Sequence, residues 1–251
     1  MDNTKRINIK ITIQYDGSKF YGFQRQKNAR TVQKEIEDCL KKIFDEDIKI
    51  KPCGRTDSGV HAFMHVSNFF VSNLKIPVNK LAEILTNELP KDIVCLKAEI
   101  VNENFNSRYD AKSREYLYII HNSTVKSPFY RKRAWFINNK ISIRKLKKTL
   151  SYIKGTHDFK SFCVNNPKTN SIRTIKKIKV KKKKDKIFIY IKGYAFLHKM
   201  IRMIIGCAIE ITLNDNYRPK KMKEIIDLKS RKKNKFTTAP AYGLYLYKIE
   251  Y

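Results

Sequence analysis

The chain has 251 residues, 42% of them hydrophobic, so it is long and apolar enough to bury a core in one large domain or two small ones. Lysine and arginine total 54 against 23 acidic residues, and the formal net charge of +31 favours a polyanionic partner such as a nucleic acid. A disordered chain is therefore not the expectation.

The first hundred residues predict alternating strands and helices. Apolar residues alternate with polar ones over residues 7–15, which predicts a half-buried strand. Thr31 can cap a helix whose apolar positions between residues 32 and 44 share one face. The other elements expected here are a short strand at 48–51, a strand at 65–71, a helix after Pro77 and a strand at 93–100. This βαββαβ order is that of the ferredoxin-like split unit.

The second part of the chain repeats the same order more loosely. The elements expected are a strand at 115–121, a helix after Ser142, strands at 172–180 and 187–191, a helix at 196–213 and a strand at 243–249. A segment near 133–136 and a short helix at 220–228 are additional. The lysine run 181–184 predicts a hairpin turn, with a contact to RNA phosphate as the alternative.

We therefore predict an α+β fold of two ferredoxin-like halves, each with an antiparallel-rich sheet, that form a central cleft. The N-terminal subdomain is expected to cover residues 1–105 and the C-terminal subdomain residues 106–251. The cleft between them is the expected functional site.

Cysteine spacing and hydropathy indicate the compartment. The five cysteines lie far apart and form no C-x-x-C pair, which disfavours a disulfide framework and a zinc site and indicates reduced thiols in a cytoplasmic protein. Residues 1–10 contain no apolar signal-peptide core, and charged residues interrupt the most apolar segment, 195–213. We expect neither export nor a membrane span.

One stretch carries the chemistry. In residues 53–62, CGRTDSGVHA, two glycines bracket a cation and a carboxylate, so the backbone can bend closely around a ligand. Taken alone, the Thr-Asp-Ser-Gly sequence favours a surface turn. A metal site built on Asp57 and His61 would lack a third ligand nearby.

Residues 54–62 closely resemble the signature of the tRNA pseudouridine synthase A family. The resemblance extends over nearly the whole chain, through residues 15–26, 105–109, 114–118, 155–162, 196–202 and 239–246. Three positions depart from the usual family pattern: Phe23 stands in place of Trp, Lys199 in place of a second His, and Met203 in place of Asn.

The resemblance implies an isomerase that converts uridine to pseudouridine without a cofactor. Its substrate would be uridine at the conventional tRNA positions 38, 39 and 40, in the anticodon stem-loop, and the enzyme would be a homodimer. Asp57 would act as nucleophile or base while the N1–C1′ bond breaks, the uracil turns and C5 joins C1′, with the order of steps left open. Enzymes that act on a base take it out of the stack, and here a basic cleft with an aromatic wall would receive it.

The resemblance also assigns four substrate-binding residues. Arg55 would contact RNA phosphate or help to extrude the base, Tyr116 would stack on the uracil, and Leu244 would pack against it. Arg202 lies in a helix that is apolar almost all round, where an unpaired guanidinium is costly to bury. Its partner by resemblance is Asp57, whereas without the resemblance a solvent-directed side chain or pairing with Glu210 is favoured.

The choice of Tyr116 also rests on the resemblance. Tyr116 and Tyr118 share one strand face by alternation, so periodicity does not rank them, and a strand tyrosine is commonly a core residue.

Two other classes of protein fit parts of the pattern. A non-catalytic RNA-binding protein with two RRM-like folds shares the βαββαβ order and the basic charge, but no strand carries the aromatic RNP string. A metal-assisted nuclease requires clustered carboxylates, whereas Asp57 is the only carboxylate of its motif.

Overall fold

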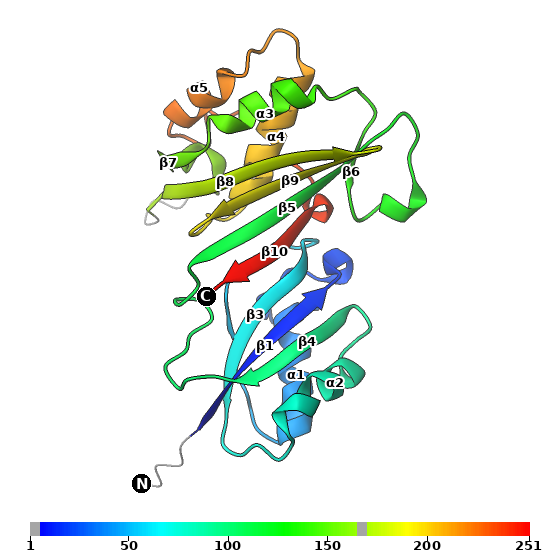
Figure 1. The fold of residues 1–251 in the computed structure, drawn as a ribbon, viewed down its shortest axis with the longest axis vertical. Coiled ribbons are helices and arrows are strands. Elements are labelled where there is room, and N and C mark those ends of the chain that lie inside the picture. Colours follow the sequence, from blue (N-terminus) through cyan, green and yellow to red (C-terminus); the bar gives the residue numbers. More distant parts are fainter. Residues whose placement is uncertain (1–5, 165–169) are drawn as a thin grey trace. The chain divides into compact units, whose positions relative to one another are not determined.

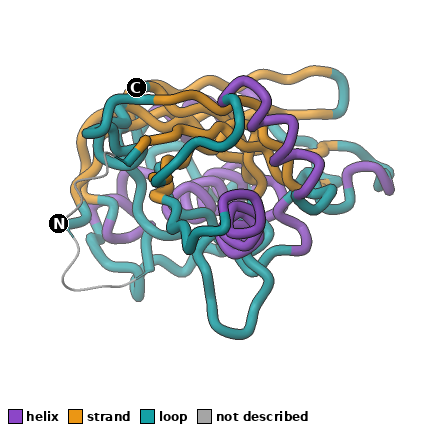
Figure 2. Tube along the Cα trace, turned by 90° about the horizontal axis from the view of Figure 1, so that it is seen from below, coloured by secondary structure: helices purple, strands orange, loops and turns teal. Residues whose placement is uncertain are grey.

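The computed structural model describes residues 6–164 and 170–251. The chain divides into two compact units. Unit 1 comprises Met1–Lys112 and Leu246–Tyr251, and unit 2 comprises Ser113–Tyr245. Each unit contains both strands and helices, which Figure 2 distinguishes by colour.

Unit 1 has the predicted βαββαβ order. Its elements are β1 (Ile7–Tyr15), α1 (Val32–Phe44), β2 (Lys51–Pro52), β3 (His61–Val71), α2 (Val78–Glu88) and β4 (Ile93–Ile100), with a 3-10 turn, η1 (Gly17–Lys19), after β1. The strands lie in the order β4-β1-β3-β2 with every pair antiparallel, and α1 and α2 pack on one face of the sheet (Figure 1). This is the strand arrangement of a ferredoxin-like unit.

The apolar face of β1 forms the core of unit 1. Ile9, Ile11 and Ile13 are fully buried, and Ile13 lies opposite His65 of β3 in the antiparallel register. Thr31 begins α1 as predicted, because its hydroxyl accepts a hydrogen bond from the backbone N of the third helical residue.

Unit 2 combines antiparallel strands with helices. Its elements are β5 (Ser113–Asn122), η2 (Pro128–Tyr130), β6 (Trp135–Ile137), α3 (Ile143–Ser151), β7 (Gly155–Asp158), η3 (Lys160–Phe162), β8 (Ile172–Lys183), β9 (Lys186–Gly193), α4 (Met200–Leu213), α5 (Lys221–Asp227) and η4 (Ala241–Gly243). The strands lie in the order β5-β9-β8-β7, all antiparallel, with the short β6 parallel to β5. The last strand, β10 (Leu244–Glu250), begins in unit 2 and ends in unit 1.

The α+β class and the antiparallel strand pairing are confirmed, while several element boundaries differ from the prediction. Helix α4 begins at Met200 rather than at residue 196, because Lys199 adopts a left-handed backbone with φ of 61° that no α-helix continues. The lysine run is mostly strand, and the hairpin turn is confined to Lys184 and Asp185. The strand predicted at 48–51 is only Lys51–Pro52. The predicted cleft between the halves stays a prediction.

The five cysteines are free thiols, and all of them are buried. Desolvation raises the pKa of Cys39 to about 11 and the pKa values of Cys95 and Cys207 to about 12, so these thiols are protonated at neutral pH. Across the described residues, no helix is both long and apolar enough to cross a bilayer.

Candidate active site

The loop that carries Asp57 joins β2 to β3 in unit 1. Asp57 is half-buried, the side chain of Arg55 is exposed, and Thr56 between them is buried. The loop closes with a turn in which the backbone N of Val60 donates to the carbonyl of Asp57 at 3.1 Å. Gly59 has a φ of 78°, a conformation that glycine adopts without strain.

A second loop, residues 20–25, lies directly against the Asp57 loop. The backbone N of Phe23 donates to the Thr56 carbonyl at 3.1 Å, and the backbone N of Gly59 donates to the Phe20 carbonyl at 3.3 Å. Gly22 has a φ of 99°, and a Cβ atom there would lie 3.0 Å from the Thr56 carbonyl oxygen. The backbone on both sides of Asp57 is therefore held by residues more than thirty positions earlier in the chain.

The turn after β1 holds the far end of the same loop. A Cβ atom on Gly17 would lie 2.0 Å from the Val60 carbonyl oxygen, so only glycine permits this approach of the two backbones. The backbone N of Gly17 donates to Nδ1 of His61 at 3.1 Å, which places the proton of the neutral imidazole on Nε2. The same Nδ1 lies 3.1 Å from the Asp16 carboxylate, a contact that becomes an ion pair only when the ring is protonated.

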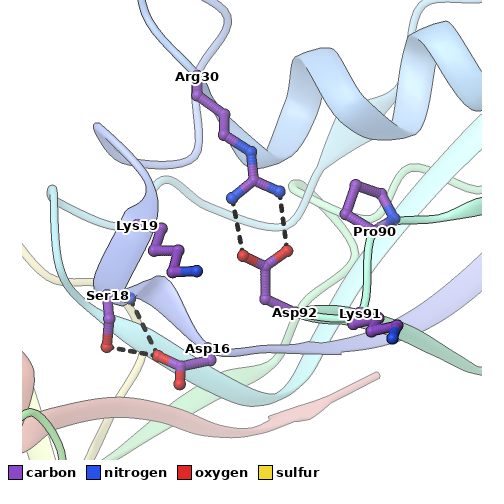
Figure 3. Close-up of a pocket in the computed structure, with 7 residues that line it drawn as sticks. All are labelled: Asp16, Ser18, Lys19, Arg30, Pro90, Lys91 and Asp92. Atoms are coloured by element: carbon purple, nitrogen blue, oxygen red, sulfur yellow. Dashed lines mark hydrogen bonds and ion pairs between the residues drawn. The ribbon is translucent and has the colours of Figure 1, made fainter.

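A cavity of about 480 Å³ opens beside this turn, lined by Asp16, Ser18, Lys19, Arg30, Pro90, Lys91 and Asp92 (Figure 3). Arg30 makes a bidentate pair with Asp92, at 2.7 and 2.8 Å, and its Nε donates to Glu35 at 2.7 Å. These carboxylates raise the pKa of the Arg30 guanidinium above its usual value. Arg30 thereby ties the start of α1 to the segment before β4.

Aromatic side chains pack beneath the Asp57 loop. The imidazole of His65 stacks on Phe23, with ring centroids 4.2 Å apart and an interplanar angle of 15°, and Tyr15 lies against both rings. The Tyr15 hydroxyl and the Thr56 hydroxyl share a hydrogen bond of 2.8 Å. Nε2 of His65 lies 3.0 Å from the carbonyl oxygen of Gly54.

Arg202 lies in the first turn of α4 in unit 2 and is half-buried. Its Nε donates to the carbonyl of Ala239 at 2.9 Å, and the backbone N of Ala239 donates back to the carbonyl of Arg202 at 3.1 Å. This reciprocal pair fixes the guanidinium stem against the segment that precedes η4. The Glu210 carboxylate accepts from the backbone N of Thr237 at 2.7 Å.

The structure distinguishes the two tyrosines that periodicity left equivalent. Tyr118 is fully buried, its hydroxyl donates to the Pro240 carbonyl at 2.8 Å, and its ring would touch a Cβ atom on Gly243 at 2.6 Å. Burial raises the pKa of Tyr118 well above its usual value. Tyr116 is only half-buried and meets Phe196 edge-on at 5.2 Å. Tyr118 is thus the core residue of the pair.

Of the predicted site residues, Arg55 and Asp57 share one loop of unit 1, whereas Tyr116, Arg202 and Leu244 belong to unit 2, where Leu244 is buried at the start of β10. His65 is not among the site residues that the sequence predicted. The one feature of the sequence that could have indicated His65 is that it is a polar residue on the apolar face of a predicted strand.

Comparison with known proteins gives one consistent result. A family model described as tRNA pseudouridine synthase matches residues 11–110 and 150–251. A protein of Brachyspira hyodysenteriae named tRNA pseudouridine synthase A is 45% identical over 243 residues, covering 95% of this chain and 96% of that protein. Proteins of the same name from Dictyoglomus thermophilum and Thermotoga neapolitana are 42% and 37% identical, over 98% and 96% of this chain and 100% and 98% of theirs.

Proposed function

Because the chain belongs to the tRNA pseudouridine synthase family, we propose that it isomerises uridine to pseudouridine at tRNA positions 38, 39 and 40 in the anticodon stem-loop, with Asp57 as the essential carboxylate. The observation that carries this proposal is the Asp57 loop. In this loop Asp57 is half-buried, Arg55 two residues earlier is exposed, and hydrogen bonds from residues 20–25 hold the backbone on both sides of Asp57.

The proposed reaction depends on a carboxylate held in a fixed orientation more than on any cofactor or metal ion. The C1′–N1 bond breaks, C5 bonds to C1′, the C5 proton leaves and N1 gains a proton, so substrate and product have the same atoms. A carboxylate can serve as nucleophile at C1′ or as the base that removes a proton. A backbone that keeps Asp57 in one place lowers the entropy cost of either role.

The remaining residues are proposed to bind the flipped nucleotide. Tyr116 would stack on the uracil and assist removal of the C5 proton, and Leu244 would pack against the base. Arg202, whose Nε is held by Ala239, would present its other nitrogens to the Asp57 carboxylate. Arg55 would contact RNA phosphate or help to extrude the base.

The net charge of +31 supports a tRNA substrate, because phosphate contacts supply most non-specific affinity for nucleic acids. We also propose that the protein is cytoplasmic, where its substrate is found, and that it acts as a homodimer with the tRNA across both subunits.

The proposal is tested with tRNA that carries tritium at uridine C5. Forming the C5–C1′ bond must expel the label into water, so the wild-type protein should release it without added metal or nucleotide. Asp57→Asn, which keeps the shape and removes the charge, should bind tRNA normally and release no label. Asp47→Asn is the matched control, because Asp47 is an exposed carboxylate paired with Lys41, and it should release label at the wild-type rate.

Three results would contradict the proposal. Release at the wild-type rate by Asp57→Asn would remove Asp57 from the chemistry. Release from stem-loops in which uridine occurs only outside positions 38 to 40 would refute the assigned positions. Normal tRNA binding with no release by the wild type would favour a non-catalytic RNA-binding protein.

A further inference from the structure

His65 lies directly beneath the Asp57 loop. It projects from β3 onto the helix-covered face of unit 1, opposite Ile13, and its side chain is fully buried. Its ring stacks on Phe23 and lies 6.0 Å from the ring of Tyr15. By these contacts alone it would be one aromatic core residue among several.

The hydrogen bonding of His65 differs from that expected of a residue that only fills space in the core. A backbone carbonyl only accepts, so the 3.0 Å contact with the Gly54 oxygen places the imidazole proton on Nε2. Nδ1 is buried without a hydrogen-bond partner. Desolvation lowers the pKa of His65 to about 4, which keeps the ring neutral and Nε2 a donor at physiological pH. A phenylalanine would fill this space without an unsatisfied nitrogen, so packing alone does not account for an imidazole here.

The Gly54 carbonyl is one of two points at which His65, Phe23 and Tyr15 hold the Asp57 loop. The other is Thr56, whose carbonyl accepts from the backbone N of Phe23 and whose hydroxyl bonds to Tyr15. Arg55 lies between the two points and Asp57 follows the second. A change at either point therefore alters the direction in which the loop presents both side chains.

We propose that His65 is a positioning residue for the pseudouridine synthase reaction. Its Nε2–H group donates to the Gly54 carbonyl and so sets the path of the loop that carries Arg55 and Asp57. This inference rests on the proposed role of Asp57.

Two substitutions separate the positioning role from packing. His65→Phe keeps a ring that can stack on Phe23 but has no donor, whereas His65→Gln keeps an N–H donor at a similar reach but has no ring. For His65→Phe we expect kcat for tritium release to fall about 10- to 100-fold, with KM for tRNA and the melting temperature close to the wild-type values. For His65→Gln we expect a lower melting temperature and a kcat within a few-fold of the wild type.

The order of the two variants decides the inference. A merely structural residue would produce the opposite order, with His65→Phe fully active and His65→Gln the more impaired, and that result would overturn the proposal. Asp57→Asn in the same assay separates the two hypotheses. If Asp57→Asn is inactive while His65→Phe is fully active, only the role of His65 is refuted; if Asp57→Asn is active, the proposed function fails first.

Discussion

Gly22 provides a test of whether the loop at residues 20–25 positions Asp57. Gly22→Ala places a side chain at a φ of 99°, which costs about 1–3 kcal/mol, and a Cβ atom 3.0 Å from the Thr56 carbonyl oxygen. The strain should lower the melting temperature by about 2–4 °C per kcal/mol in a chain of this size. The contact should also displace the Asp57 loop, and a shift of about 1 Å at a catalytic group can cost about 100-fold in rate.

Gly155 is the matched control for this experiment. Its φ is 104°, but a Cβ atom there would meet only a side-chain nitrogen of His157, at an ordinary 3.6 Å. Gly155→Ala should therefore carry a similar backbone strain and leave tritium release unchanged. Thermal melts and single-turnover tritium release on both variants give the comparison. If the two variants lose equal stability and both retain the wild-type rate, the loop contact does not position Asp57.

Two further predictions concern stability. Burial lowers the pKa of His65 to about 4 from about 6.5 in an unfolded chain, so between these values the unfolded state binds more protons and stability falls as the pH drops. The free energy of unfolding should be roughly 2 kcal/mol lower at pH 5 than at pH 7 because of this residue. His65→Gln lacks this titration, so its free energy of unfolding, measured with urea, should decline less between the two pH values. Equal declines for the two proteins would contradict a buried neutral ring. Tyr118→Phe removes the donor to Pro240 and should lower the unfolding free energy by about 1–2 kcal/mol, whereas Tyr116→Phe should destabilise less and slow tritium release roughly 100-fold or more. A larger stability loss for Tyr116→Phe than for Tyr118→Phe would invert the assignment of the core tyrosine.

The order of elements followed from the sequence because it depends on local periodicity. The alternation over residues 7–15 and the one-faced pattern after Thr31 each need only a few neighbouring side chains, and both elements occur where predicted. Boundaries that depend on a single backbone angle did not follow. Lys199 lies in an apolar stretch that extends the helical pattern, and only its left-handed conformation delays α4 to Met200.

The candidate site divides in the same way. A short motif was enough to single out Asp57 and Arg55, because the residues that make the signal are adjacent in the chain. The contacts that hold these two residues could not be predicted from the motif. Gly22 approaches Thr56 and His65 bonds to Gly54 from distant parts of the chain, and local periodicity does not encode such contacts. Likewise, alternation puts Tyr116 and Tyr118 on one strand face, and only the packing of Gly243 and Pro240 decides which ring is buried. Local pattern thus determined the elements and the motif, and contacts between distant segments determined which side chains support the fold and which remain available for chemistry.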